Sequence, residues 1–210
     1  MMEEILNRPL KDALVILQER SLTQSTYFGI PAVKNPLDFW IYREIIFEQK
    51  PDVIIEIGTH CGGTTLALAH ICDLMNRGSI IGVDISQALV SYQIKSHPRI
   101  TLIEGDACQA FEYVCNKINQ TANILIIEDS AHTFRNTLNV LEVYSPLIKP
   151  GGYFIVEDSI CHHGLNEGPY PGPYEAIEMF LKSNHDFESD RSREPAITWN
   201  PKGYLRRKCE

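Results

Sequence analysis

Five short apolar runs, separated by stretches of helical pattern, limit the folds open to this chain more than any other feature of its sequence. The runs are Val53–Ile57, Ile80–Val83, Ile100–Ile103, Ile124–Ile127 and Tyr153–Val156. They are apolar on both faces, as expected of parallel strands that helices cover on both sides. Helices are expected between them, for example over Thr64–Met75 and Leu138–Leu147. This repeated alternation predicts a doubly wound α/β sheet.

The segments on either side of this alternation follow other patterns. Met1–Glu19 places apolar residues at helical spacing, and a second amphipathic helix is expected over Pro36–Gln49, with proline in its first turn. Near the end, Ala176–Leu181 reads as helical. Phe187–Ser189 and Ile197–Trp199 then read as two strands without a helix between them, which predicts a closing antiparallel hairpin.

Length and composition indicate one soluble domain. The 210 residues suit a single domain over residues 1–210, in which residues 1–50 form a helical segment packed on the core. The net charge of −8 disfavours nucleic acid as a partner. No apolar run approaches the ~18–20 residues of a membrane helix, and no secretory signal is evident, so a cytoplasmic protein without a membrane partner is expected. The six cysteines form no C-x-x-C pair, which favours reduced thiols.

Three of the predicted strands end in residues that suit a nucleoside. The first is followed by a turn containing Gly58, Gly62 and Gly63, the second ends at Asp84, and the third ends at Gly105-Asp106. Glycines allow a ligand close to the backbone, and an acid after the second strand can accept both ribose hydroxyls. The turn matches neither G-x-G-x-x-G nor a P-loop. Plain turns and helix caps are the alternative explanation of these residues.

The fourth and fifth strands end in acids. Asp129 follows the fourth strand, and Glu157 and Asp158 follow the fifth. Neighbouring parallel strands would bring these carboxylates together, where a hard cation such as Mg²⁺ would neutralise them. His132, three residues after the first acid, is a candidate general base. The alternative is that the acids cap helices or pair with Arg135.

Two further groups of residues have weaker interpretations. His162 and His163 are rival bases that fall near the predicted loop Gly164–Pro173. The basic residues near the end of the chain predict a solvated or ion-paired surface, with a subunit contact as the alternative. They are Arg191, Arg193, Arg206, Arg207 and Lys208.

Six stretches carry a resemblance to a known family. They are Gly29–Ile46, Pro51–Ala69, His97–Ile100, Tyr144–Ser159, Gly172–Ile177 and Asp190–Arg207. On these residues the chain resembles the cephalosporin hydroxylase family of class I S-adenosylmethionine-dependent methyltransferases, which includes rhamnosyl O-methyltransferase-like proteins. The resemblance implies a Rossmann-like seven-stranded sheet, parallel except for an antiparallel C-terminal hairpin, with extra N-terminal helices.

The resemblance also implies roles for individual residues. Glu56, Gly58, Thr59 and Gly62 would flank the methionine part of the cofactor, Asp84 would hold its ribose, and Gly105 and Asp106 would lie at its adenine. Asp129, Glu157 and Asp158 would hold the metal, and His132 matches the base of similar macrolide-sugar O-methyltransferases. Some members use an acid two residues after the position of Asp129, where this chain has Ala131.

The sequence therefore predicts a Mg²⁺-dependent O-methyltransferase that uses S-adenosylmethionine. Its acceptor would be a hydroxyl of a small molecule, such as a sugar or polyketide in natural-product biosynthesis. The apolar stripes of the N-terminal helices predict a homo-oligomer. The rival readings are an NAD-dependent oxidoreductase on a similar sheet, which the glycine spacing opposes, and an inactive cofactor-binding or assembly protein.

Overall fold

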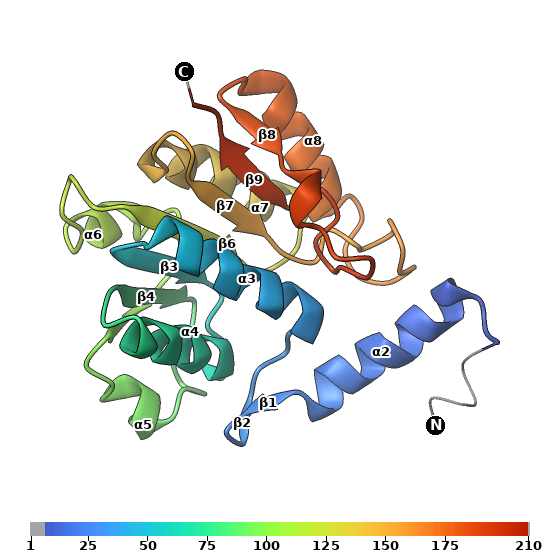
Figure 1. The fold of residues 1–210 in the computed structure, drawn as a ribbon, viewed down its shortest axis with the longest axis horizontal. Helices are drawn as coiled ribbons and strands as arrows, with labels where there is room; N and C mark the ends of the chain where they lie inside the picture. The colour runs from blue at the N-terminus through green and yellow to red at the C-terminus, as the bar shows by residue number, and fades with distance from the viewer. Residues whose placement is uncertain (1–6, 210) are drawn as a thin grey trace.

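A computed structural model describes residues 7–209 and contains a seven-stranded sheet (Figure 1). Its strands lie in the order β5-β4-β3-β6-β7-β9-β8. They are β3 (Val53–Ile57), β4 (Ser79–Asp84), β5 (Ile100–Glu104), β6 (Ile124–Glu128), β7 (Tyr153–Val156), β8 (Phe187–Ser189) and β9 (Tyr204–Arg207). The first five pair in parallel, whereas β9 pairs antiparallel with both β7 and β8. The predicted sheet with its antiparallel hairpin is therefore confirmed.

Helices cover both faces of the sheet. One face packs against α3 (Pro36–Gln49), α4 (Gly63–Leu74) and α5 (Tyr92–Lys95), and the other against α6 (Phe111–Cys115), α7 (Phe134–Tyr144) and α8 (Pro173–Ser183). Within β3, Ile54 packs into the first layer while Ile55 and Ile57 pack into the second. Because successive side chains point to opposite faces, a strand covered on both sides carries apolar residues on both faces.

Local chemistry sets where α3 begins and ends. The Asn35 side chain accepts a hydrogen bond from the Leu37 backbone N–H at 3.1 Å, and Pro36 occupies the first turn. Lys50 ends the helix in a left-handed conformation, and its N–H donates to the Ile46 carbonyl. The predicted span of this helix is therefore confirmed.

The predicted strand at Ile197–Trp199 is wrong, because the hairpin pairs β8 with β9 instead. The polar atoms of this segment bind Asp38, which is 1 % exposed. The Trp199 N–H donates to Asp38 at 2.7 Å and the Thr198 hydroxyl at 2.5 Å, and the Tyr204 hydroxyl adds a bond at 2.7 Å. Backbone donors that serve a buried carboxylate cannot also serve a strand ladder.

The N-terminal helix differs from its prediction in its bounds. α2 spans Leu10–Gln24, so it ends five residues beyond the predicted Glu19, and the predicted residues 1–6 lie outside the described part of the chain. It runs at the edge of the molecule and is followed by the small hairpin of β1 (Thr26–Tyr27) and β2 (Ile30–Pro31) (Figure 1). Leu14 packs with Ile160, Leu165 and Trp199. Among residues 7–209, no helix has the length and apolar character required to cross a membrane.

Candidate active site

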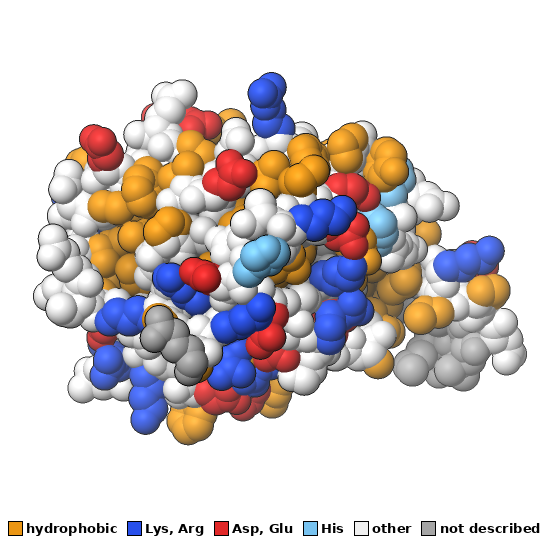
Figure 2. Space-filling model, turned by 90° about the horizontal axis from the view of Figure 1, so that it is seen from above, with side chains coloured by type: hydrophobic (Ala, Val, Ile, Leu, Met, Phe, Trp, Pro, Cys, Tyr) orange, Lys and Arg blue, Asp and Glu red, His pale blue; other side chains and the backbone are white. Residues whose placement is uncertain are grey.

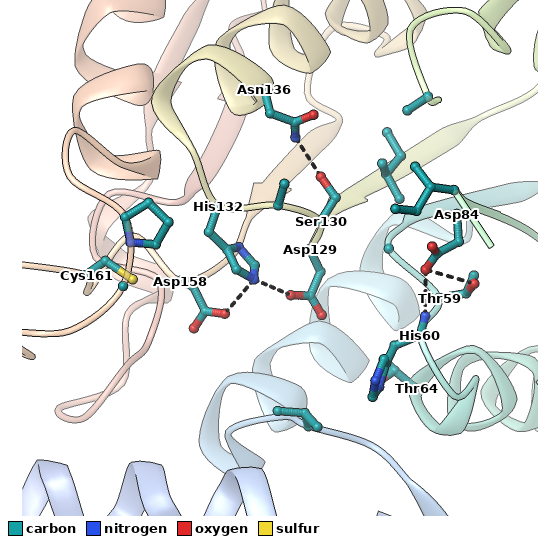
Figure 3. A pocket seen from close by; sticks show the side chains of 18 of the residues that line it. Thr59, His60, Thr64, Asp84, Asp129, Ser130, His132, Asn136, Asp158 and Cys161 are labelled. Carbon is teal, nitrogen blue, oxygen red and sulfur yellow. Dashed lines mark hydrogen bonds and ion pairs between the residues drawn. The ribbon is translucent and has the colours of Figure 1, made fainter. Parts of the chain in front are cut away.

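A cavity of about 600 Å³ opens at the carboxyl ends of the parallel strands (Figure 3). This is the edge at which open α/β sheets bind ligands. The residues predicted for the site that line it are Gly58, Thr59, Asp84, Gly105, Asp106, Asp129, His132 and Asp158. Its outer walls include Gln18 and Leu22 of α2, and Leu165 and residues 167–169 of the loop before α8. The cavity is large enough for a nucleoside-sized ligand beside a second small molecule.

Gly58 brings the loop after β3 into close contact with the loop after β6. Its φ angle is +96°, and a Cβ atom there would lie 1.9 Å from the Asp129 carbonyl oxygen. The Asp129 N–H in turn donates to the Ile57 carbonyl at 2.8 Å. Only glycine allows this approach, which places the acid after β6 next to the predicted cofactor turn.

Asp84 stands at the end of β4 with its carboxylate partly held by backbone donors. One oxygen accepts from the His60 N–H at 2.8 Å, and the other accepts from the Ser86 N–H at 3.2 Å. The Thr59 hydroxyl lies 3.4 Å from the first oxygen. A carboxylate oriented in this way retains lone pairs for hydroxyl groups in the cavity.

Gly105 and Asp106 form the next part of the cavity wall. Gly105 has a φ angle of +149°, and a Cβ atom built there would meet no atom within 4 Å. One Asp106 oxygen caps the following turn by accepting from the Gln109 N–H at 3.0 Å. The capping alternative weighed from the sequence therefore applies to this oxygen, while the residue still borders the cavity.

Two of the residues predicted to flank the cofactor do not line the cavity. Glu56 is 1 % exposed, and its carboxylate accepts from the Thr65 hydroxyl behind the turn. Burial raises the pKa of Glu56 to about 8, and the Thr65 bond opposes that rise. Gly62 precedes α4, and a Cβ atom there would lie 2.6 Å from the Ile94 side chain. Both residues therefore support the turn from the side that faces away from the cavity.

Asp129, His132 and Asp158 converge on the far side of the cavity (Figure 3). The His132 Nε2 atom lies 3.3 Å from an Asp158 oxygen and 3.7 Å from an Asp129 oxygen. His132 has a φ angle of +52° and Asp158 one of +54°, a region that non-glycine residues seldom adopt. Burial raises the pKa of Asp158, which His132 opposes and Asp129 reinforces. Strain of this kind is concentrated at functional sites.

Glu157 does not line the cavity, and its carboxylate contacts Lys34, a residue that the sequence reasoning missed. The Lys34 ammonium lies 2.6 Å from an Asp129 oxygen and also contacts both oxygens of Glu157. Burial alone would lower the pKa of Lys34, but the two carboxylates outweigh it and raise that pKa above its ordinary value. The sequence signal that could have indicated Lys34 is a lysine that directly follows the apolar residues 30–33.

Glu128 is a buried acid to which the sequence reasoning assigned no role. It ends β6, where one oxygen accepts from the Ser130 hydroxyl at 2.7 Å and from the Asn136 amide at 3.2 Å. Its other oxygen has no hydrogen-bond partner among the described residues. Burial raises the pKa of Glu128 to about 7, against the effect of the Ser130 bond. The network supports Ser130 and Asn136, which line the cavity.

The two alternative candidates for the general base, His162 and His163, contact residues outside the group of Asp129, His132 and Asp158. His163 Nε2 lies 2.6 Å from a Glu175 oxygen, and its ring stacks on Tyr174 with 3.6 Å between ring centroids. His162 Nε2 lies 3.1 Å from the Gly168 carbonyl oxygen. Neither lines the cavity, so His132 is the histidine that the structure places beside the two acids.

Three of the five basic residues near the end of the chain form ion pairs, in line with the predicted solvated or ion-paired surface. The pairs are Arg191 with Glu194 at 2.5 Å, Arg193 with Glu48, and Arg207 with Asp186 at 3.2 Å. On the face shown in Figure 2, Lys and Arg side chains lie among Asp and Glu side chains and form no continuous basic surface. Exposed pairs of this kind contribute little to stability.

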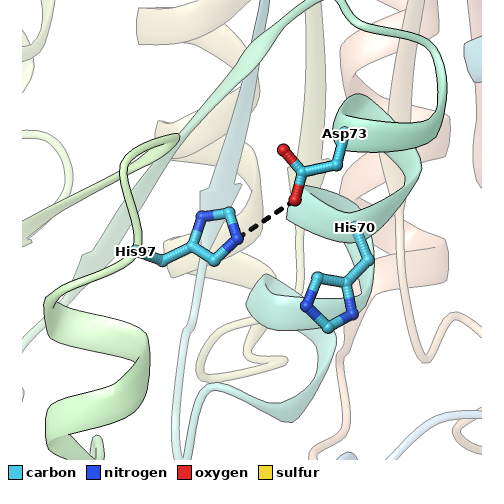
Figure 4. A group of neighbouring side chains, drawn as sticks. All are labelled: His70, Asp73 and His97. Carbon is cyan, nitrogen blue, oxygen red and sulfur yellow. Dashed lines mark ion pairs between the residues drawn. The ribbon is translucent and has the colours of Figure 1, made fainter.

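A second group of possible metal ligands lies outside the cavity, at the end of α4 (Figure 4). His97 Nε2 lies 3.2 Å from one Asp73 oxygen, and Arg99 donates to the other at 2.6 Å. The Arg99 backbone N–H lies 3.3 Å from His97 Nδ1, which leaves Nε2 as the donor toward Asp73. His70 Nδ1 lies 3.0 Å from the Tyr27 hydroxyl. The contacts of Asp73 with His97 and Arg99 tie α4 to the loop before β5, whereas His70 contacts the β1 residue Tyr27.

Comparison with known proteins identifies the family. The family model described as rhamnosyl O-methyltransferase/CmcI matches residues 19–208. Rhamnosyl O-methyltransferase of Mycobacterium tuberculosis is 33% identical over 191 residues, which cover 87% of this chain and 78% of that protein. The chain belongs to the rhamnosyl O-methyltransferase/CmcI family. Rhamnosyl O-methyltransferase of Mycobacterium leprae is 32% identical over 200 residues, which cover 88% of this chain and 83% of that protein.

Solved structures agree with the fold of this family. CmcI in a form described with Mg and SAM has a TM-score of 0.71 at 23% identity, covering 88% of this chain and 77% of that one. The O-methyltransferase TomG of Streptomyces achromogenes, in complex with SAM, has a TM-score of 0.62 at 14% identity, covering 94% and 90%. The family, the O-methyltransferase class and the fold predicted from the sequence are therefore confirmed.

Proposed function

We propose that the chain acts as one methyltransferase domain that transfers a methyl group from S-adenosylmethionine to a hydroxyl of a small molecule. One observation carries this proposal: a single cavity is lined both by Asp84 and Asp106, which suit a nucleoside, and by the group of Asp129, His132 and Asp158. Membership of the rhamnosyl O-methyltransferase/CmcI family supports the same reaction. The named relatives support a sugar or a related natural product as the acceptor.

In this proposal the cofactor lies along the ends of β3, β4 and β5. The residues that would contact it are Gly58, Thr59, Asp84, Gly105 and Asp106. Asp84 accepts the ribose hydroxyls, and the open space at Gly105 admits the adenine. Glu56 and Gly62 support this wall from beneath, because their own contacts are with Thr65 and Ile94.

The acid group fits a hard divalent cation such as Mg²⁺. Asp129 and Asp158 line the cavity, and their oxygens lie within 4.8 Å of one another and of His132 Nε2. Carboxylate oxygens are the donors that Mg²⁺ prefers. When bound, the ion would lower the pKa of the acceptor hydroxyl and fix its orientation. Glu157, the third predicted ligand, is occupied by Lys34.

His132 takes the proton of the acceptor hydroxyl. Its Nε2 atom lies near the carboxylates of Asp158 and Asp129, whose negative charge stabilises the imidazolium that forms. The apolar wall of Leu22, Leu165 and Pro169 faces the same space and would exclude water from the reacting atoms. The cavity would thereby hold the general base, the oriented hydroxyl and the sulfonium methyl close together for the transfer.

Calorimetry with the purified protein tests the cofactor assignment. We expect S-adenosylmethionine and S-adenosylhomocysteine to bind, and NAD to produce no heat of binding. Asp84→Asn should weaken S-adenosylmethionine by about 10–100-fold, because a charge-assisted hydrogen bond contributes ~1.5–3 kcal/mol. NAD binding in the absence of any response to S-adenosylmethionine would favour the oxidoreductase reading instead.

We also infer that the chain forms homo-oligomers. The outer face of α3 exposes Leu37, Trp40 and Phe47, with Trp40 at 59% and Phe47 at 64% exposure. Large apolar side chains gathered on one helix are typical of a surface that a second subunit covers. Light scattering at micromolar concentration measures this directly, and a monomeric mass would refute the inference.

A further inference from the structure

Lys34 is placed among acids in a way that the proposed chemistry does not require. The side chain enters from the segment between β2 and α3, and only 6% of it is exposed. Its ammonium contacts one oxygen of Asp129, at 2.6 Å, and both oxygens of Glu157. Neither acid is adjacent to it in sequence, so the contact joins three separate segments of the chain.

The contacts divide the predicted acid set into two parts. Glu157, 5% exposed, has both oxygens on Lys34, whereas Asp158 has an oxygen 3.3 Å from His132. Asp129 contributes to both parts, with one oxygen on Lys34 and the other 3.7 Å from His132. Unpaired buried charges are costly, so these acids and the ammonium stabilise one another.

The space around Lys34 also limits what can reach Glu157. A cavity of about 30 Å³ borders Lys34, Glu157 and Asp158 on the side of α2. That volume accommodates about one water molecule. Mg²⁺ usually retains several waters, so a hydrated ion fits in the large cavity beside Asp129 and Asp158 rather than between Lys34 and Glu157.

We propose that Lys34 is a built-in cation of the acid group, which occupies Glu157 and one oxygen of Asp129 and leaves Asp158 and the other oxygen of Asp129 to a divalent ion. The proposal rests on the proposed function for the identity of that ion. Lys34 then neutralises part of the buried negative charge and keeps the acid group intact in the absence of the ion. Glu157 is then a partner of Lys34 and contributes no ligand atom.

Charge-matched variants separate this proposal from the alternative that Glu157 is a ligand of the divalent ion. The three carboxylates and one ammonium give a local formal charge of −3 + 1 = −2. Lys34→Met leaves −3 and frees Glu157, whereas Lys34→Met with Glu157→Gln restores −2 without the pair. Asp158→Asn removes a proposed ligand. Mg²⁺ binding is measured by calorimetry, with Mn²⁺ and electron paramagnetic resonance as an independent probe.

The two assignments of Glu157 predict different affinities. We expect Lys34→Met to bind Mg²⁺ at least about tenfold more tightly, because a third carboxylate becomes available. The double variant should stay within about threefold of wild type, while Asp158→Asn should lose about 10–100-fold. A double variant that loses as much affinity as Asp158→Asn would make Glu157 a ligand and overturn the proposal.

Thermal unfolding in metal-free buffer tests Lys34 without relying on the metal chemistry. Lys34→Met should melt roughly 10 °C below the double variant, because it leaves buried carboxylates without their partner. Added Mg²⁺ should raise the melting temperature of Lys34→Met more than that of wild type. Equal melting of the single and double variants would overturn the proposal. If wild type binds no divalent ion, the proposed metal chemistry fails, and this melting comparison alone decides the role of Lys34.

Discussion

Gly58→Ala tests whether close approach of two loops holds the site together. The substitution adds one methyl group at the turn after β3, where the φ angle is +96°. The new Cβ atom would lie 1.9 Å from the Asp129 carbonyl oxygen and 2.6 Å from its carbonyl carbon. Both contacts are with backbone, so no side-chain rotation relieves them. The loop that carries Asp129 must therefore move away from the cofactor turn.

The expected cost has two parts. A left-handed conformation costs a non-glycine residue ~1–2 kcal/mol. Overpacking against fixed backbone adds ~1–3 kcal/mol. The sum is about 2–5 kcal/mol, which lowers the melting temperature of a chain of this size by roughly 5–20 °C. The displaced Asp129 should also weaken the binding of Mg²⁺.

Gly105→Ala is the matched control for this experiment. It has a φ angle of +149°, which is also strained for alanine, but its Cβ atom would meet nothing within 4 Å. It should therefore carry the conformational cost alone, ~1–3 kcal/mol, and retain Mg²⁺ binding. Circular dichroism melts of both variants give the comparison. If Gly58→Ala is as stable as Gly105→Ala, the reasoning from the close loop contact is refuted.

Three further changes test other parts of the site. His132→Ala should slow methyl transfer by ~10²–10⁴ while metal affinity by calorimetry changes little, and an unchanged rate would exclude it as the base. Between about pH 5 and pH 8, folded Glu56 keeps a proton that the unfolded chain releases, because its pKa is raised to about 8. Wild type should therefore lose stability relative to Glu56→Gln as the pH rises through this range. Parallel melting-temperature profiles of the two proteins against pH would contradict this. Asp38→Ala should lower the free energy of unfolding in urea by ~2–4 kcal/mol, because the Trp199 and Tyr204 donors lose their acceptor, and a loss below ~0.5 kcal/mol would contradict that role.

The sheet could be predicted because its signal is local. Each parallel strand is covered on both faces, so Ile124–Ile127 is apolar at every position and Val53–Ile57 at every position except Glu56. The end of the chain was harder, because Ile197–Trp199 has the composition of a strand. The Trp199 backbone N–H instead donates to Asp38, which lies 161 residues earlier in the chain. A contact between residues so far apart cannot be predicted from the local sequence pattern.

The same limit applies to the site. Residues at the ends of parallel strands meet at one edge, so Asp84, Asp106 and Asp129 could be placed at one cavity from the order of the strands. The direction of each side chain could not be read in this way. Glu157 and Asp158 are adjacent, yet one contacts Lys34 and the other His132. Which partner each acid takes depends on the packing of the segment before α3.

Methyl transfer to a defined hydroxyl is the measurement that tests the central claim most directly. The purified protein would be incubated with S-adenosylmethionine labelled in its methyl group and with sugar and polyketide alcohols, and the products followed by mass spectrometry. We expect label in an ether methyl of one acceptor, loss of transfer in excess chelator, recovery with Mg²⁺, and no transfer by Asp158→Asn. Full transfer in chelator would contradict the metal role of the acids. Transfer of label to no acceptor, by a protein that binds S-adenosylmethionine, would contradict the assignment as an O-methyltransferase of this acceptor class.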